Sequence, residues 1–309
     1  MIRKHNRRAA KAAYAISLGV AIVIGLLAAS AGAAPTSSQA KTITIGTKNF
    51  PEEFILGQLY KQALEAQGFT VKYKENIGST ELIHTALTSG KIDLYPEYTG
   101  VVVQVVHHRA SSPATAHATF LLAKALEKKN NITVANPTPF YDTDVLAVTN
   151  ETAKQHGLKS IGDLKKVGEF KLGGFPECKT RTTCFLGYTK RYGLTEASFV
   201  PVGGLSPYAM LDQGDVLAAD VFSTDPPLAK PSKYTVLADP KHVTGFQNVV
   251  PLIRTPVVKA QGSVLTSTVN KVSSKLTLSA MIAMNKAVIV NKKSPKVVAA
   301  TFLKANGLK

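Results

Sequence analysis

The spacing of apolar residues changes period repeatedly along the chain, which is the pattern of alternating strands and helices. Strands are expected over 42–46, 69–74, 143–149 and 170–174, and helices over 55–67, 80–89, 115–129, 205–213, 274–287 and 295–306. Gly68 ends the first helix, because glycine readily adopts the conformation that follows a helix end. Strands that alternate with helices indicate an α/β fold.

Two stretches of the chain repeat one order of residue types. Residues 86–100, ALTSGKIDLYPEYTG, align without a gap with residues 210–224, MLDQGDVLAADVFST. In each, a helix end meets a turn glycine, a short apolar strand follows, and an aromatic residue precedes a hydroxyl residue. The repeat places Tyr98 and Phe222 at matching positions.

A second repeat lies upstream of the first. Residues 42–60 and 170–188 both run from a strand through a loop into a helix, and each loop carries a cation, Lys48 or Arg181. Ligands of such sheets bind beyond the carboxyl ends of the strands. Taken alone, each cation is typical of a protein surface and each aromatic of a core. Two facing halves would gather these side chains at one cleft: Lys48, Tyr98, Arg181, Tyr208 and Phe222.

The first 33 residues have the order of a secretory signal. Residues 1–14 are basic, residues 15–30 are apolar and uncharged, and Ala31-Gly32-Ala33 fits a cleavage site. We expect a signal peptide over 1–33 and a protein outside the cytoplasmic membrane, in the periplasm or at the cell-envelope surface. An uncleaved anchor is the alternative, although the apolar run is short for a span of about 20 residues.

The chain has only two cysteines, Cys178 and Cys184. An even number of cysteines in an exported protein predicts a disulfide between them. Two reduced thiols or a metal site are alternatives. The metal site is weaker because no second pair of ligands accompanies the cysteines. We expect no bound metal.

Composition narrows the class of protein further. The 309 residues, 45% of them apolar, are enough to bury a core. A net charge of +17 suits nucleic acid, anionic lipid or cell-wall polymer as a neighbour. The lysines beyond the N-terminus are scattered and no nucleic-acid motif is present, so we expect a surface adapted to an anionic envelope and no nucleic-acid partner. The chain lacks H-E-x-x-H and G-x-S-x-G, which argues against the main alternative, an exported enzyme.

Several segments together resemble a known family, the substrate-binding proteins of ABC importers for glycine betaine, choline, carnitine and related osmoprotectants. The likeness covers 41–309 and is carried by 43–60, 78–100, 174–194, 221–228, 240–254 and 296–308. It implies a type II periplasmic-binding-protein fold, in which two α/β lobes are joined by a two-segment hinge with the ligand cleft between them. Lobe one would hold 41–145 and 250–309, and lobe two the inserted residues 150–245.

The resemblance also implies a function. The protein would capture a small quaternary-ammonium ligand by lobe closure and deliver it to the permease subunits of an ABC importer. It would act as a monomer, without catalysis and without a cofactor. The alternative is an exported binding domain for another small amino-acid-like solute, used in sensing rather than uptake.

The family pattern assigns roles to particular residues. Tyr98, Tyr208 and Phe222 fall on an aromatic cage for the quaternary ammonium, and Lys48 and Arg181 fall on cations that hold a ligand carboxylate. Two positions depart from the pattern: Asp144 stands where a further cage tyrosine is frequent, and Val101 where a threonine is common. A cage of three rings and a ligand other than glycine betaine would follow. The remaining residues expected at the site are Thr99, Asp142 and Thr224.

Overall fold

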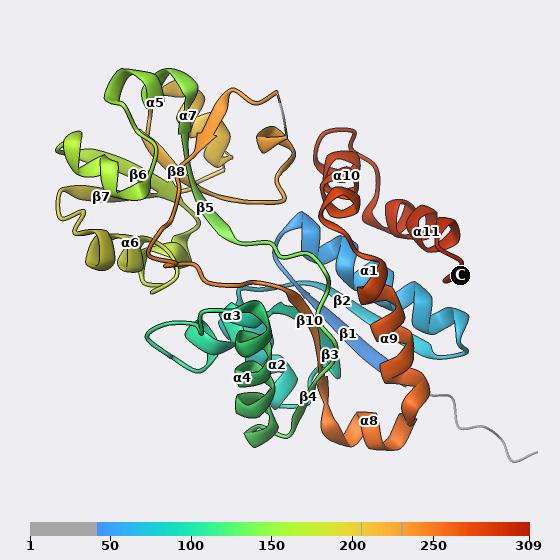
Figure 1. The fold of residues 1–309 in the computed structure, drawn as a ribbon. Helices are drawn as coiled ribbons and strands as arrows, with labels where there is room; N and C mark the ends of the chain where they lie inside the picture. The colour runs from blue at the N-terminus through green and yellow to red at the C-terminus, as the bar shows by residue number, and fades with distance from the viewer. Residues whose placement is uncertain (1–41, 205, 230) are drawn as a thin grey trace, which may run out of the picture. The chain divides into compact units, whose positions relative to one another are not determined.

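A computed structural model describes residues 42–204, 206–229 and 231–309 (Figure 1). The predicted signal peptide, 1–33, lies outside the described residues. The described chain forms two five-stranded sheets with helices packed around them.

The first sheet combines the early strands of the chain with one late strand. Its order is β2-β1-β3-β10-β4, with β1 parallel to β2 and β3, and β10 antiparallel to β3 and β4. Because β1 and β3 are parallel, their last residues, Lys48 and Tyr98, lie at the same edge of the sheet. The strands are β1 (Thr42–Lys48), β2 (Thr70–Gly78), β3 (Leu94–Tyr98), β4 (Ile132–Val134) and β10 (Val249–Arg254).

The second sheet is built from the middle of the chain. Its order is β7-β6-β8-β5-β9, with β6 parallel to β7 and β8, and β5 antiparallel to β8 and β9. The parallel pair β6 and β8 again brings two strand ends, Gly174 and Phe222, to one edge. The strands are β5 (Asp144–Thr149), β6 (Phe170–Gly174), β7 (Ala197–Pro201), β8 (Ala218–Phe222) and β9 (Tyr234–Val236).

The helices fill the connections between strands. In the described part of the chain, none is both long and apolar enough to cross a membrane. The helices and helical turns of the N-terminal half are α1 (Pro51–Ala66), α2 (Thr80–Thr88), α3 (Thr99–Val101), η1 (Val102–Val106), α4 (Ala116–Lys129) and α5 (Asn150–His156). Those that follow are η2 (Ile161–Lys166), η3 (Pro176–Lys179), α6 (Phe185–Tyr192), α7 (Pro207–Gln213), η4 (Pro226–Leu228), α8 (Thr255–Gln261), α9 (Ser263–Lys275), α10 (Leu278–Ile289) and α11 (Pro295–Ala305).

Helix α1 begins earlier than the apolar spacing predicts. We expected its start at residue 55, whereas the structure starts it at Pro51. Proline suits the first helical position because its fixed backbone angle is already helical, and acidic residues are favoured in the first turn. The earlier start carries Glu52 and Glu53 into the helix, where both side chains are buried.

The single helix expected over 274–287 is wrong. Helix α9 ends at Lys275 and α10 begins at Leu278, because Leu276 takes an extended conformation and the Thr277 hydroxyl accepts a hydrogen bond from the amide of Ala280 at 3.2 Å. Leu276 is nevertheless fully buried. Its burial keeps the apolar spacing continuous through the break, which is why the spacing did not reveal it.

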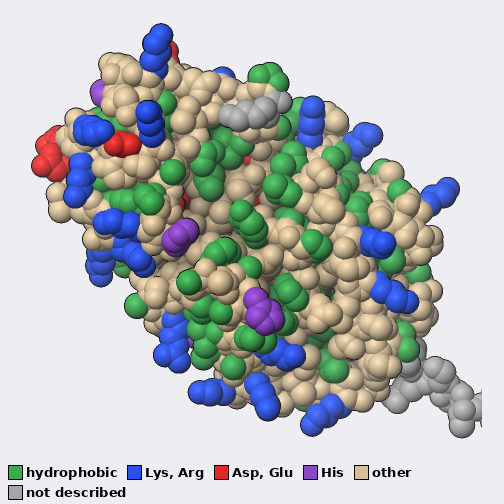
Figure 2. Space-filling view, viewed as in Figure 1, with side chains coloured by type: hydrophobic (Ala, Val, Ile, Leu, Met, Phe, Trp, Pro, Cys, Tyr) green, Lys and Arg blue, Asp and Glu red, His purple; other side chains and the backbone are tan. Residues whose placement is uncertain are grey.

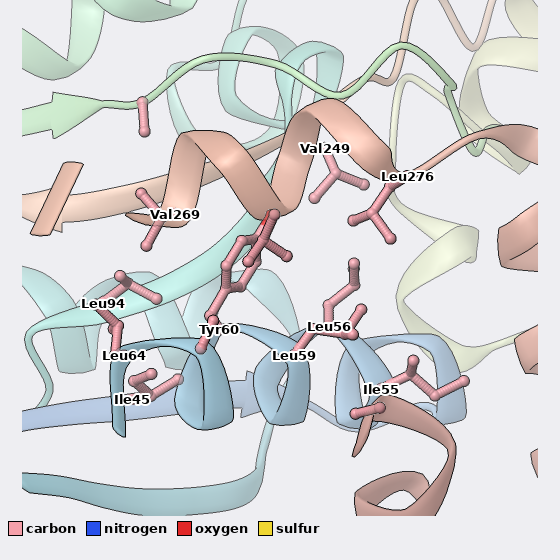
Figure 3. Packing of buried hydrophobic residues seen from close by; sticks show 14 of the residues in the cluster. Ile45, Ile55, Leu56, Leu59, Tyr60, Leu64, Leu94, Val249, Val269 and Leu276 are labelled. Atoms are coloured by element: carbon pink, nitrogen blue, oxygen red, sulfur yellow. The ribbon is translucent and has the colours of Figure 1, made fainter. Parts of the chain in front are cut away.

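A large core fixes α1 against the first sheet and the C-terminal helices. Figure 3 shows Leu56, Leu59 and Tyr60 of α1 directed toward Val269 and Leu276. Burying a side chain of this size is worth about 1.5–3 kcal/mol, so the cluster holds the helix firmly. The N-terminal turn of α1 is thereby fixed beside the carboxyl ends of β1 and β3.

Candidate ligand-binding site

A cavity of about 60 Å³ lies where the carboxyl ends of the two sheets meet. Strand ends and the loops that follow them supply its walls, as expected for α/β sheets. One wall comes from the first sheet and its helices, the other from the second. The lining side chains include Lys48, Phe50, Thr80, Tyr98, Asp142, Asp144, Phe175, Glu177, Arg181 and Phe222.

Four aromatic rings stand in a row along this cavity. Phe50 stacks on Tyr98 with ring centroids 6.3 Å apart and on Phe222 at 5.4 Å, and Phe175 stacks on Phe222 at 6.0 Å. Adjacent planes differ by only 20–23°. Tyr98 and Phe50 belong to the wall formed by the first sheet, and Phe222 and Phe175 to the wall formed by the second. The row of rings therefore joins the two walls.

Lys48 is held inside the first wall by its own acidic partner. Its ammonium lies 2.5 Å from Glu97 Oε1 and 3.9 Å from Glu53 Oε1. The same nitrogen lies 4.3 Å from the centre of the Tyr98 ring, within the range of a cation–π contact. Burial raises the pKa of Glu53 to about 8, and the nearby Lys48 charge opposes that rise. The face of Tyr98 therefore already meets a cation.

Glu52 connects the two walls. One carboxylate oxygen accepts from the Tyr98 hydroxyl at 3.0 Å, and the other accepts from the Thr224 hydroxyl at 2.6 Å and from the Asn285 amide at 2.8 Å. Burial raises the pKa of Glu52, and these three donors act against that rise by favouring the ionised form. The contacts tie α1 to the loop after β8 and to α10.

Two further acids line the cavity. Asp144 is the first residue of β5, and Asp142 lies two residues before it in the chain. Asp142 Oδ1 accepts from the Thr224 amide and the Ser223 hydroxyl, both at 3.1 Å. Burial, together with Glu52, raises the pKa of Asp142 well above its usual range. Burial also raises the pKa of Asp144 to about 6, against the opposing charges of Arg181 and Lys48. A bound cation would favour the ionised form of both acids.

Arg181 reaches the cavity from the second wall, but it already contacts a carboxylate. Its Nη2 donates to both oxygens of Glu81, at 3.2 and 3.1 Å, across to helix α2. Its Nε is buried and has no hydrogen-bond partner among the described residues. The Nε–H is thus left to donate to a ligand oxygen.

A disulfide holds the loop that carries Arg181. Cys178 and Cys184 are bonded to each other and buried, which confirms the predicted pairing. The backbone of Arg181 is hydrogen-bonded to both cysteines. In the described part of the chain, the one grouping with metal-ligand spacing is Cys178, Cys184 and Asp220, and its sulfurs are committed to the disulfide.

Charge in the cavity is unbalanced. Both lining cations have acidic partners, Lys48 with Glu97 and Arg181 with Glu81. The lining acids Asp142, Asp144 and Glu177 form no ion pair with any residue that the structure describes. The cavity therefore combines ring faces with acidic groups that lack a cation.

The structure brings six of the nine expected ligand-binding residues to this cavity. Tyr208 and Thr224 line an adjoining cavity of about 270 Å³ instead, and Tyr208 donates there to Asp225 at 3.0 Å. Thr99 lines neither; its hydroxyl donates to the carbonyl of Phe246 at 3.0 Å. The six residues at the first cavity are Lys48, Tyr98, Asp142, Asp144, Arg181 and Phe222.

Sequence reasoning missed Phe50, Phe175 and the acids around Lys48. A signal for the two phenylalanines was present: Phe50-Pro51-Glu52 and Phe175-Pro176-Glu177 repeat the same tripeptide. In both tripeptides the phenylalanine precedes a helical segment and the proline is the first residue of that segment. Glu97 follows no such pattern, because its role comes from the register that brings it beside Lys48.

Comparison with known proteins places the chain in a family. The family of the "Substrate binding domain of ABC-type glycine betaine transport system" matches residues 41–305. A glycine-betaine-binding protein of Pseudomonas aeruginosa is 30% identical over 283 residues, which cover 88% of this chain and 90% of that protein. An ergothioneine transport permease/ergothioneine-binding protein of Helicobacter pylori is 30% identical over 271 residues, covering 87% of this chain and 48% of that protein.

A solved structure agrees with the architecture. Apo YehZ from Escherichia coli superposes with a TM-score of 0.63 at 26% identity, covering 87% of this chain and all of that chain. The mixed α/β fold with two sheets is that of type II periplasmic-binding proteins, as the sequence predicted. The family consists of transport proteins rather than enzymes. The chain belongs to the family of substrate-binding domains of ABC-type glycine betaine transport systems.

Proposed function

We propose that the protein captures a small quaternary-ammonium solute outside the cytoplasmic membrane and delivers it to the permease of an ABC importer. The observation that carries the proposal is the cavity of stacked ring faces and unpaired acids. Membership of a glycine betaine transport family gives it independent support.

The chemistry of such a ligand explains why these residue types suit it. A quaternary ammonium has no N–H donor, so directed hydrogen bonds cannot recognise it. Ring faces attract it electrostatically, by about 2 kcal/mol or more per ring when water is excluded. The acids Asp142 and Asp144 add attraction over a longer range, because charges interact more strongly in a poorly solvated cavity.

Each expected site residue takes a role in this proposal. Tyr98 and Phe222 form the cage together with Phe50 and Phe175, and the free Nε of Arg181 donates to an oxygen of the ligand. Lys48 positions Tyr98 and adds a positive charge at the oxygen end of the ligand. Tyr208 extends the cage on the side of the adjoining cavity. Thr99 and Thr224 support the cavity wall through their hydrogen bonds.

Ligand capture would involve closure of two lobes. We take lobe one as 41–145 with 250–309 and lobe two as 150–245. The return of β10 to the first sheet, where it pairs with β3 and β4 after the second sheet is complete, supports this division. The contacts of Glu52 with Thr224 and of Arg181 with Glu81 join the lobes when the cleft is closed. Closure excludes water and strengthens each interaction with the ligand.

Delivery to an importer implies a location and a partner. We propose that the protein is exported by the segment 1–33, acts as a monomer, and meets permease subunits at the outer side of the membrane. It would not catalyse a reaction and would need no cofactor.

A panel of ligands in a thermal-shift measurement tests the proposal. Glycine betaine, choline, carnitine, proline betaine and ergothioneine carry a quaternary ammonium, whereas ordinary amino acids do not. A ligand at 100 times its Kd raises the free energy of unfolding by about 2.7 kcal/mol, which is a clear shift. We expect at least one quaternary amine to stabilise the protein. Stabilisation by amino acids alone, or by none of these compounds at millimolar concentration, would reject the proposal.

A further inference from the structure

The positive charge of the described chain is concentrated in its last 55 residues. Residues 42–254 contain 22 lysines and arginines against 20 acids, which nearly balance. Residues 255–309 contain nine lysines and no aspartate or glutamate. A uniform basic surface, the simplest interpretation of the net charge, therefore does not describe this molecule.

These residues form α8, α9, α10 and α11, of which the last three pack around α1 (Figure 1). All nine lysines are exposed, and none forms an ion pair with another described residue. Figure 2 shows lysine and arginine side chains over this side of the molecule without acidic ones among them. We call the exposed surface of α9, α10, α11 and the turn between α10 and α11 the basic face. Its lysines include Lys271, Lys275, Lys286, Lys292, Lys293 and Lys296.

Apolar side chains are exposed on the same helices. Eight large hydrophobic side chains are exposed in the described chain, and four of them belong to α9–α11 and the turn between α10 and α11, with 41–55% of their surface accessible. They are Val264, Leu278, Val290 and Val297. The turn between α10 and α11 is the densest part, because Val290 and Val297 flank Lys292, Lys293 and Lys296 within eight residues.

Lysines without acidic neighbours repel one another, and an anionic surface relieves that repulsion. An anionic polymer would satisfy the lysines but would leave the valines in water. A lipid headgroup region satisfies both, since phosphates meet the ammonium groups while short apolar side chains enter the boundary of the acyl chains. The mixture of exposed lysine and valine therefore favours a membrane surface over a soluble polyanion.

We propose that the basic face, chiefly through the turn between α10 and α11, docks on the anionic phospholipid surface of a membrane. This interaction goes beyond solute capture and requires no solute in the cleft. It keeps the protein at the membrane between encounters with a permease. Each lysine near such a surface is worth about fivefold in affinity, so several together give reversible attachment.

Vesicle flotation with the native processed protein tests this proposal. The anionic vesicles contain phosphatidylglycerol and phosphatidylethanolamine, and the neutral vesicles contain a galactolipid. Phosphatidylcholine is avoided because its headgroup carries a trimethylammonium group that the cleft is proposed to bind. We expect flotation with the anionic vesicles only, decreasing as salt screens the charges. Equal flotation with both kinds, or with neither, would overturn the proposal.

Variants locate the interaction. We expect the triple change Lys292→Gln, Lys293→Gln and Lys296→Gln to weaken vesicle binding at least about tenfold. The matched control replaces three exposed lysines outside the basic face that form no ion pair with described residues, Lys154, Lys159 and Lys171, and should change binding little. Equal losses in both triples would mean that net charge alone drives binding and would reject the basic face.

The valines separate lipid from polymer. The pair Val290→Ser and Val297→Ser should weaken binding to phosphatidylglycerol vesicles several-fold and leave binding to soluble polyphosphate unchanged. Unchanged vesicle binding in this pair would contradict a lipid surface as the partner. Far-UV circular dichroism of each variant checks that the fold is retained, and ligand-induced thermal stabilisation checks the cleft separately.

Discussion

The two strand–loop–helix units at the cavity repeat one sequence order but hold their charges differently. In the unit β1–α1, Lys48 is 4% exposed and pairs with the fully buried Glu97. In the unit β6–α6, the Arg181 side chain is 18% exposed and pairs with Glu81, whose side chain is 51% exposed. An ion pair between a cation and a carboxylate is thus buried in the unit β1–α1 and partly exposed to solvent in the unit β6–α6.

The two ion pairs therefore have different roles: one stabilises the first sheet, and the other joins the two walls of the cleft. Lys48 and Glu97 both belong to the first sheet, so their contact persists whether the cleft is open or closed. Arg181 and Glu81 come from opposite walls, and their contact can form only when the walls meet. Sequence similarity between the two loops therefore indicates similar position but not similar function.

The largest effect, on stability, is expected from breaking the ion pair of Lys48 and Glu97 in the first sheet. Lys48→Met leaves Glu97 buried without its cation, which should lower the free energy of unfolding by about 3–5 kcal/mol. Arg181→Met is the matched change in the other unit and should cost at most about 1 kcal/mol, because Glu81 is half exposed and stays solvated without its partner. Urea unfolding of both variants measures the contrast. Equal losses would remove the distinction between the two units.

A smaller effect, on ligand affinity, is expected from removing one aromatic ring of either wall. Tyr98→Ala should weaken binding of a quaternary amine about 30-fold, since one desolvated ring face is worth about 2 kcal/mol. Tyr98→Phe keeps the ring and loses only the hydrogen bond to Glu52, so it should retain most of the affinity. Tyr208→Ala changes a ring of the adjoining cavity and should have the weaker effect of the two alanine variants. Titration calorimetry measures all three, and a greater loss for Tyr208→Ala would place the ligand in the adjoining cavity.

Much of this arrangement was predictable from the order of residue types. The repeat of a turn glycine, a strand and an aromatic residue placed Tyr98 and Phe222 correctly at strand ends, because the point where a strand ends is set by residues close to it in the chain. The packing partners were not predictable. Glu97 meets Lys48 across parallel strands 49 residues apart, and Arg181 meets Glu81 over 100 residues.

The break in the C-terminal helices shows the same limit at the level of the fold. Apolar spacing indicates only which side chains face the core. Leu276 faces the core although it is an extended residue between two helices, so the spacing does not show the break. The start of α1 at Pro51 was missed for the opposite reason. Polar residues in the first turn suggested a loop, whereas both glutamates are buried, Glu52 against the distant Thr224 and Glu53 beside Lys48 at the end of β1.

The smallest expected effect is a pH dependence that arises in the second wall. Asp144 has its pKa raised to about 6 by burial, so it is ionised at neutral pH and protonated in mild acid. A bound cation favours the ionised form, and affinity for choline should therefore fall several-fold from neutral pH to about pH 5. Asp144→Asn should bind less tightly at neutral pH and show a flatter profile. The same profile in Asp144→Asn and the unaltered protein would assign the dependence to another acid, such as Asp225, whose pKa burial also raises to about 6.

Recognition of a cation through ring faces and unpaired acids depends on the charge of the ligand as well as on its shape. Choline and 3,3-dimethylbutan-1-ol have nearly the same shape, but only choline carries a charge. Calorimetric titration of the protein with both compounds separates charge from shape. Choline should bind, and the neutral isostere should bind at least about 100-fold more weakly, because the loss of both cation–π contact and attraction to the acids exceeds about 2.7 kcal/mol. Equal affinity for the two compounds, or binding of the neutral alcohol alone, would contradict recognition of the charge.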